Sequence, residues 1–315
     1  MNRARHGHDV VTPGEIMAMF VAEENSLEHA EHFRRRLAGA ELNVSVGLAR
    51  LGHRVGFLGA VGDDPLGTHA RRTLEAEGID AAGLTVDPAA GTGFQLKNRV
   101  AEGDPTVVYF RRASAGSRFA WSESCAELVG GARHLHLTGV FAALSASTLD
   151  CARKAVDRAR AVGATVSFDP NLRPALWSDR GEMVEVINEL AERADWVLPG
   201  LDEGEVLTGA ADPAAVADFY LSRGVSEVVI KLGGRGAELH TPQGSHSLPA
   251  HPVEVVDTVG AGDGFAAGWI SARLDGLSAE DALRRACEVG ARATTSRGDM
   301  DGLPTRRLLE QPVGA

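Results

Sequence analysis

Short apolar segments and amphipathic segments alternate along most of this chain, and this alternation restricts the possible folds more than any other sequence feature. Helix-like patterns separate the strand-like runs, which cover residues 55–61, 134–137, 165–168, 196–198 and 228–231. Gly78 and Gly163 follow two of the predicted helices, at positions where a left-handed glycine commonly ends a helix. This spacing predicts an α/β fold with a doubly wound, mostly parallel sheet flanked by helices.

Two stretches, residues 16–22 and 93–112, interrupt the alternation and have the composition of β-strands. A turn is predicted between the strands of the second stretch, at residues 102–105. We predict a small β-sheet lid with strands from about residues 14–24 and 92–113, inserted in a single domain spanning residues 1–315. An ordinary extension of the main sheet is the alternative.

Charge and cysteine usage narrow the class of protein. The formal net charge of -11 argues against a nucleic-acid partner, because no basic stripe is present to neutralise phosphates. We find no apolar run long enough for a membrane span, and residues 1–9 read as a polar, frayed tail rather than a signal peptide. Three widely spaced cysteines favour a reducing compartment, so we expect a cytoplasmic protein.

Residues 257–265 carry the strongest chemical signal. They follow an apolar run at 253–256 that reads as a strand, and they precede Phe265, Trp269 and Ile270, which have helical spacing. Small residues at the start of a helix let an anion approach its unpaired N–H groups. We therefore predict an anion hole at Gly260, Ala261 and Gly262.

Asp263 lies in the first turn of this predicted helix, where two roles are open. It can act as a base toward an attacking hydroxyl, or it can serve as a helix cap. In either role, the positive end of the helix is expected to stabilise its ionised form.

The segment Asp257-Thr258-Val259-Gly260-Ala261-Gly262-Asp263 resembles the C-terminal signature of the ribokinase-like (PfkB) sugar kinases. The resemblance implies transfer of a phosphoryl group from ATP to a sugar hydroxyl, with Mg²⁺, Asp263 as the base and Gly260, Ala261 and Gly262 as the anion hole. It also implies nucleotide-binding roles for Lys231, Gly233, Gly236, Gly262 and Glu203. A K⁺ near Asp257 and the loop at 294–298 is a further family expectation. The chain departs from the family pattern at Gly200, where an asparagine is usual.

Residues 14–17, 109–115 and 168–174 resemble 2-keto-3-deoxygluconate kinases, whose substrate carries a carboxylate that arginine pairs can bind. The resemblance implies substrate contacts at Gly39, Asn43, Tyr109, Arg111 and Arg173. It also implies one at Gln95, where the family pattern has a tyrosine. It also implies a homodimer formed through the lid. Arg111 and Arg112 can instead be sheet-edge charges, and Arg173 can instead cap or pair within its own loop. A fructokinase, a nucleoside kinase and a non-catalytic nucleotide- or sugar-binding regulator remain the alternatives.

Overall fold

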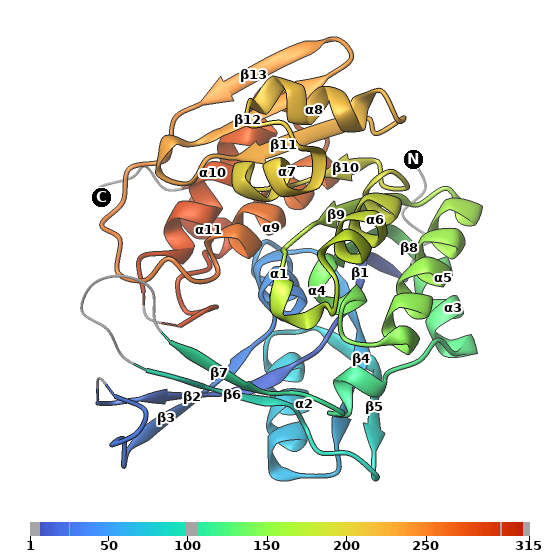
Figure 1. Ribbon diagram of the computed structural model, residues 1–315. Coiled ribbons are helices and arrows are strands. Elements are labelled where there is room, and N and C mark those ends of the chain that lie inside the picture. Colours follow the sequence, from blue (N-terminus) through green and yellow to red (C-terminus); the bar gives the residue numbers. More distant parts are fainter. Residues whose placement is uncertain (1–6, 25, 99–105, 297, 311–315) are drawn as a thin grey trace.

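Two β-sheets organise the described part of the chain, residues 7–24, 26–98, 106–296 and 298–310 of a computed structural model (Figure 1). The large sheet has nine strands in the order β13-β12-β11-β10-β9-β8-β1-β4-β5. Strands from β11 to β5 are parallel, whereas β12 and β13 join antiparallel at one edge. The strands are β1 (His8–Pro13), β4 (Val55–Gly62), β5 (Asp80–Asp87), β8 (Ala132–Thr138), β9 (Thr165–Asp169), β10 (Trp196–Val197), β11 (Glu227–Lys231), β12 (Ala237–Thr241) and β13 (Gly244–Leu248).

Helices cover both faces of the large sheet, and each face has its own apolar core. One core lies under α1 (Ala40–Arg50), α2 (Pro65–Ala76), α9 (Ala261–Leu274) and α10 (Ala279–Ala293). The other lies under α3 (Glu123–Gly130), α4 (Gly139–Ala142), α5 (Ala146–Val162), α6 (Arg180–Ala191), α7 (Leu201–Thr208) and α8 (Pro213–Leu221). Strand β4 is buried at every position, as expected where helices cover both faces of a parallel sheet. The predicted α/β architecture is confirmed.

The small sheet projects from the body of the molecule and has the order β3-β2-β6-β7 (Figure 1). Its strands are β2 (Met17–Ala22), β3 (Phe33–Ala38), β6 (Phe94–Lys97) and β7 (Val107–Phe110). The two predicted strand regions therefore form a sheet of their own rather than an extension of the large one. The turn predicted at residues 102–105 lies outside the described residues. Strand β3 was not predicted, because three consecutive arginines mask its pattern at the exposed edge of the sheet.

Two predictions about extended segments were wrong. Strand β1 begins at His8, within the predicted frayed tail, and His8 Nε2 lies 2.8 Å from Asp80 Oδ2. The apolar run at 253–256 is not a strand, and Val255 and Val256 are 58% and 49% exposed. Strand propensity did not decide the structure here, because this segment has no neighbouring strand to pair with.

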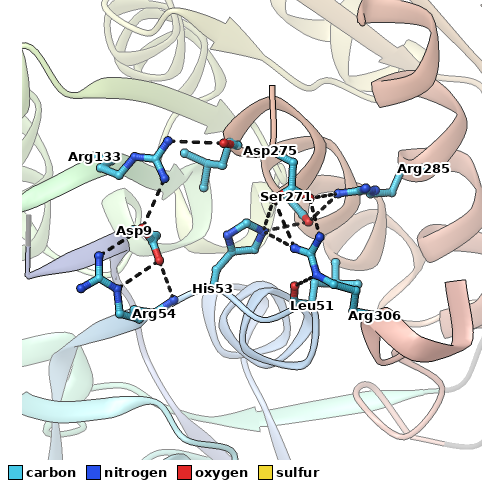
Figure 2. Close-up of polar contacts among 10 residues, drawn as sticks. Asp9, Leu51, His53, Arg54, Arg133, Ser271, Asp275, Arg285 and Arg306 are labelled. Carbon is cyan, nitrogen blue, oxygen red and sulfur yellow. Dashed lines mark hydrogen bonds and ion pairs between the residues drawn. The ribbon is translucent and has the colours of Figure 1, made fainter. Parts of the chain in front are cut away.

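The C-terminal end of α9 is held by a polar network that also joins α1, α10 and α11 (Arg306–Leu309) (Figure 2). The Asp275 carboxylate accepts hydrogen bonds from Arg285 at 2.6 Å and from Arg306 at 2.7 Å. Arg306 also donates to the Leu51 carbonyl at 2.6 Å, and His53 lies 2.9 Å from Ser271 Oγ. Burial alone would raise the pKa of Asp275, but the hydrogen bonds from the two arginines outweigh it and lower that pKa. Ion pairs between Asp275 and the two arginines thus hold the C-terminal end of α9 in place.

All three cysteines, Cys125, Cys151 and Cys287, are buried and unpaired, as the sequence predicted. Within the described ranges, no helix combines the length and the apolar character that a membrane crossing requires.

Candidate active site

A cavity of about 630 Å³ lies where the carboxyl ends of the parallel strands face the small sheet. Ligands of open α/β sheets bind at this edge. Most of the predicted site residues line it: Gly39, Asn43, Gln95, Tyr109, Arg111, Arg173, Glu203, Lys231, Gly260, Gly262 and Asp263. Four others, Ala261, Gly233, Gly236 and Asp257, lie outside the lining.

Helix α9 begins at this cavity, and no other residue can replace its N-cap glycine, Gly260, without strain. Gly260 caps the helix with a φ of 82°, and a Cβ there would lie 2.5 Å from the Asp299 carbonyl oxygen. The Ala261 N–H donates to the Thr258 carbonyl at 3.3 Å. A Cβ on Gly262 would lie 3.6 Å from Lys231 Nζ. The N-terminal end of α9 and the Lys231 ammonium therefore lie next to each other.

The Asp263 carboxylate points across the cavity and makes no capping hydrogen bond. Asn43 Nδ2 donates to its Oδ2 at 2.7 Å, and Asn171 Nδ2 donates to its Oδ1 at 3.3 Å. Burial raises the pKa of Asp263 to about 8, outweighing the Asn43 hydrogen bond and the charges of Lys231 and Arg173. Desolvation is thus the larger effect, and it opposes the stabilisation of the ionised form that was expected from the helix end.

Lys231 places a positive charge beside Asp263. Its ammonium donates to Asp169 Oδ2 at 2.7 Å, at the ends of two parallel strands. Burial opposes the charged form, but the carboxylates of Asp169, Glu203 and Asp263 together raise the pKa of Lys231. The lysine is therefore a fixed cation in the lining of the cavity.

Glu203 and the glycines after β11 have different surroundings. The Glu203 carboxylate lines the cavity and accepts backbone N–H bonds from Leu172 at 2.7 Å and from Gly200 at 2.8 Å. The Gly200 position thus supplies a backbone donor where the family usually has an asparagine. Gly236 has a φ of 104°, and a Cβ there would lie 2.0 Å from the Leu248 carbonyl, so the tight turn itself requires glycine.

Arg111 is buried in the lining of the cavity, with 9% of its surface exposed. Its Nε donates to Glu15 Oε2 at 2.7 Å, and Nη2 lies 2.5 Å from the same oxygen. Ser114 Oγ donates to the other oxygen of Glu15. Arg111 is thus no sheet-edge charge, whereas the neighbouring Arg112 is exposed.

Gln95 and Tyr109 face each other across β6 and β7, and both line the cavity. The Arg111 guanidinium lies 5.9 Å from the centre of the Tyr109 ring. Arg173 Nη1 donates to the Leu172 carbonyl at 2.9 Å. The small sheet and the loop after β9 therefore bring two guanidinium groups to one cavity.

Sequence reasoning missed Glu15, Lys97, Asn171 and Asp299 as individual site residues. Asp299 is 6% exposed, and burial raises its pKa to about 6. Lys97 Nζ donates to Asp257 Oδ2 at 2.9 Å, and the Val259 N–H donates to Asp257 Oδ1 at 3.1 Å. The alternation of Gln95 and Lys97 along β6 was a usable signal for Lys97, since both side chains face the same side. Nothing local marked Asp299.

Comparison with known proteins places this geometry in context. A family model described as "pfkB family carbohydrate kinase" matches residues 8–306. A 2-dehydro-3-deoxygluconokinase of Bacillus subtilis (strain 168) is 48% identical over 98% of this chain and 96% of its own length. The enzyme of that name from Thermoproteus tenax is 33% identical over 92% of this chain and 89% of its own length.

Solved structures agree with the fold. A PfkB protein from Polaromonas sp. JS666 is 48% identical, with a TM-score of 0.90 over 97% of this chain and 100% of its own. A putative ribokinase II from E. coli, in complex with ATP and Mg²⁺, is 29% identical, with a TM-score of 0.88 over 96% and 97% of the two chains. A double mutant of fructokinase from Vibrio cholerae O395, bound to fructose, ADP and potassium ion, is 27% identical, with a TM-score of 0.82 over 98% of each chain.

Proposed function

This chain belongs to the pfkB family of carbohydrate kinases, and from this premise we propose that its substrate is 2-dehydro-3-deoxygluconate, also called 2-keto-3-deoxygluconate. ATP-dependent phosphorylation of a sugar is the activity of the family. The choice of a sugar acid rests on one observation: Arg111 and Arg173 both line the cavity that contains Asp263. Paired guanidinium donors suit a carboxylate better than the hydroxyls of a neutral ketose.

The hydrogen bonds of Arg111 suit this role. Glu15 takes the donors on the Nε and Nη2 side of the guanidinium, and no described residue accepts a hydrogen bond from Nη1. Because Glu15 is 2% exposed, it holds the arginine in one orientation. Gly39, Asn43, Gln95 and Tyr109 complete the proposed substrate contacts, and Asp299 is placed to accept a hydrogen bond from a substrate hydroxyl.

The proposed reaction is an in-line displacement at the γ-phosphorus of ATP. Asp263 accepts the proton of the primary hydroxyl while that oxygen bonds to phosphorus, and the bond between the γ-phosphorus and the β–γ bridging oxygen breaks to release ADP. Lys231 and the amides of Gly260 and Gly262 at the start of α9 stabilise the charge on the transferred group, whereas the Ala261 amide already donates to the Thr258 carbonyl. Since the pKa of Asp263 lies near 8, this carboxylate is a stronger base than an ordinary aspartate.

Mg²⁺ would be held mainly by phosphate oxygens and water, and Glu203, which lines the cavity, would be the carboxylate that assists. Among the described residues, no group of three or more histidine, cysteine or acidic side chains could hold a metal by itself. This donor set fits Mg²⁺, which usually binds one or two carboxylates together with substrate phosphates. Mg²⁺ supplies charge neutralisation to the triphosphate, and Gly233 and Gly236 shape the loop beside it.

A substrate panel tests the proposal. ADP release would be measured with 2-keto-3-deoxygluconate, fructose, ribose and adenosine, each with MgATP. We expect kcat/KM for the sugar acid to exceed that for fructose by about 100-fold or more, because fructose has no carboxylate for Arg173 and for the donors that Glu15 leaves free on Arg111. Equal or better turnover of fructose would favour the fructokinase alternative, and turnover of adenosine alone would favour a nucleoside kinase.

We propose that the small sheet acts as a lid within one domain spanning residues 1–315. We also propose that the outer face of this sheet forms the interface of a homodimer. Phe94 and Phe110 stack with ring centres 4.6 Å apart, and Val108 and Phe110 remain 41% and 47% exposed. An exposed apolar face of this kind commonly marks an interface. The three unpaired cysteines suit the proposed cytoplasmic location.

Replacing Phe110 by glutamate (Phe110→Glu) is expected to convert a dimer into a monomer, because a charge would be buried at the proposed interface. Sedimentation equilibrium measures the mass. Leu308→Glu is the matched control, since Leu308 is 45% exposed but lies away from the small sheet. A wild-type protein that sediments as a monomer would refute the dimer.

A further inference from the structure

Several carboxylates gather where the loop before α9 meets the cavity. Asp263 and Asp299 line the cavity, and the Asp257 side chain, 20% exposed, lies in the loop that leads to Gly260. The charge of Asp257 also contributes to the raised pKa of Asp299. Where these carboxylates are ionised, they repel the phosphates of a nucleotide unless a cation compensates.

Lys97 is such a cation, and it comes from the small sheet. Its ammonium donates to Asp257 Oδ2 at 2.9 Å, its side chain is 7% exposed, and it lowers the pKa of Asp299 by its charge. The pair joins β6 to a loop 160 residues away. Gln95 and Lys97 both belong to β6 and line the same cavity. Strand β6 therefore carries the proposed substrate contact Gln95 together with the positive charge that balances Asp257.

The residues around Asp257 do not fit the monovalent cation expected there. Lys97 occupies one carboxylate oxygen, and the Val259 N–H occupies the other. A potassium ion bound to the same carboxylate would lie close to the ammonium, and the two positive charges would repel each other. The Asp257 and Val256 N–H groups already donate to the Thr294 carbonyl, at 3.1 and 2.8 Å, so the loop is held without an ion.

We propose that Lys97 serves as a built-in monovalent cation: its ammonium neutralises Asp257, so this kinase binds MgATP without added potassium. Lys97 acts through Asp257 and the loop that presents Gly260 and Gly262, and it is therefore a positioning residue. The proposal rests on the use of ATP by the family and not on the identity of the sugar.

Lys97→Met tests this role, with Lys154→Met as the matched control. Lys154 also forms an ion pair, with Asp150 at 2.8 Å, but its side chain is 51% exposed on α5. Affinity for MgATP would be measured by titration calorimetry in tetramethylammonium chloride and in potassium chloride at equal ionic strength. This readout needs no sugar, so it stands even if the proposed substrate is wrong.

The wild type and the Lys154 variant are expected to bind MgATP equally well in both salts. The Lys97 variant should bind about tenfold more weakly in tetramethylammonium, where a carboxylate has lost its partner, and potassium should restore most of that loss. Turnover should follow the same pattern. Circular dichroism would confirm that the variant is folded.

The proposal would be overturned by an equal response to potassium in the wild type and the Lys97 variant. It would also be overturned by unchanged binding in the variant without potassium. A loss of binding that potassium does not relieve counts against it too, because Lys97 would then act on the ligand directly.

Discussion

Replacing Asp263 by asparagine (Asp263→Asn) is expected to lower kcat about a thousandfold while the protein still binds MgATP, since positioned bases contribute this order of rate enhancement. Asparagine keeps the size of the side chain, and its Oδ1 can still accept a hydrogen bond from Asn43 or Asn171. It cannot accept the proton of the attacking hydroxyl. Single-turnover kinetics and calorimetric titration with MgATP separate the two effects.

The same substitution should stabilise the folded protein at alkaline pH. The pKa of Asp263 rises from 3.8 to about 8 on folding, so the folded state holds more protons than the unfolded state between these values. Stability therefore falls as pH rises through this range, and asparagine, which does not ionise, avoids the loss. We expect the Tm of the variant to exceed that of the wild type at pH 9, and the difference to disappear below pH 4. In the wild type, kcat/KM should rise with pH up to about 8.

Asp281→Asn is the matched control, because Asp281 is also the third residue of a helix but is exposed on α10. It accepts hydrogen bonds from Ser278 and Arg284, which lower its pKa. The control should keep full turnover and gain no stability at pH 9. Substantial turnover of the Asp263 variant would refute the assigned base, and a lower Tm at pH 9 would refute the raised pKa.

Replacing Arg111 by methionine (Arg111→Met) is expected to lower kcat/KM for 2-keto-3-deoxygluconate by about 10²- to 10³-fold, because a substrate carboxylate would lose its paired donors. The change also leaves Glu15 buried without its ion-pair partner. This loss would lower activity with any substrate and not only with the sugar acid. The ratio of kcat/KM for the sugar acid to that for fructose is therefore the measurement that isolates recognition.

Arg112→Met removes the same charge one residue away, from an exposed position. This control should change neither kcat/KM nor the selectivity ratio. If the Arg111 variant lost activity on both sugars in equal proportion, Arg111 would be a structural residue and the sugar-acid proposal would lose its main support.

Elements with strong periodicity and a glycine stop were predictable from the sequence. Helix α5 ends at the left-handed Gly163, and β4 is apolar throughout. Strands β1, β3, β5, β12 and β13 were missed. In β3 and β13, arginines and other polar residues obscure the alternation at exposed edges. The apolar run at 253–256 failed for the opposite reason: strand composition without a partner strand makes no sheet.

For the candidate site, local sequence was enough wherever the chemistry depends on neighbouring residues. The small residues at 260–262 and the helical pattern after them placed an open helix end and Asp263 together, because a helix start is decided within a few residues. The pKa of Asp263, the orientation of Arg111 by Glu15 and the pairing of Lys97 with Asp257 depend on segments distant in sequence. Burial and long-range ion pairs exist only once the large and small sheets have packed, so only the tertiary structure decided them.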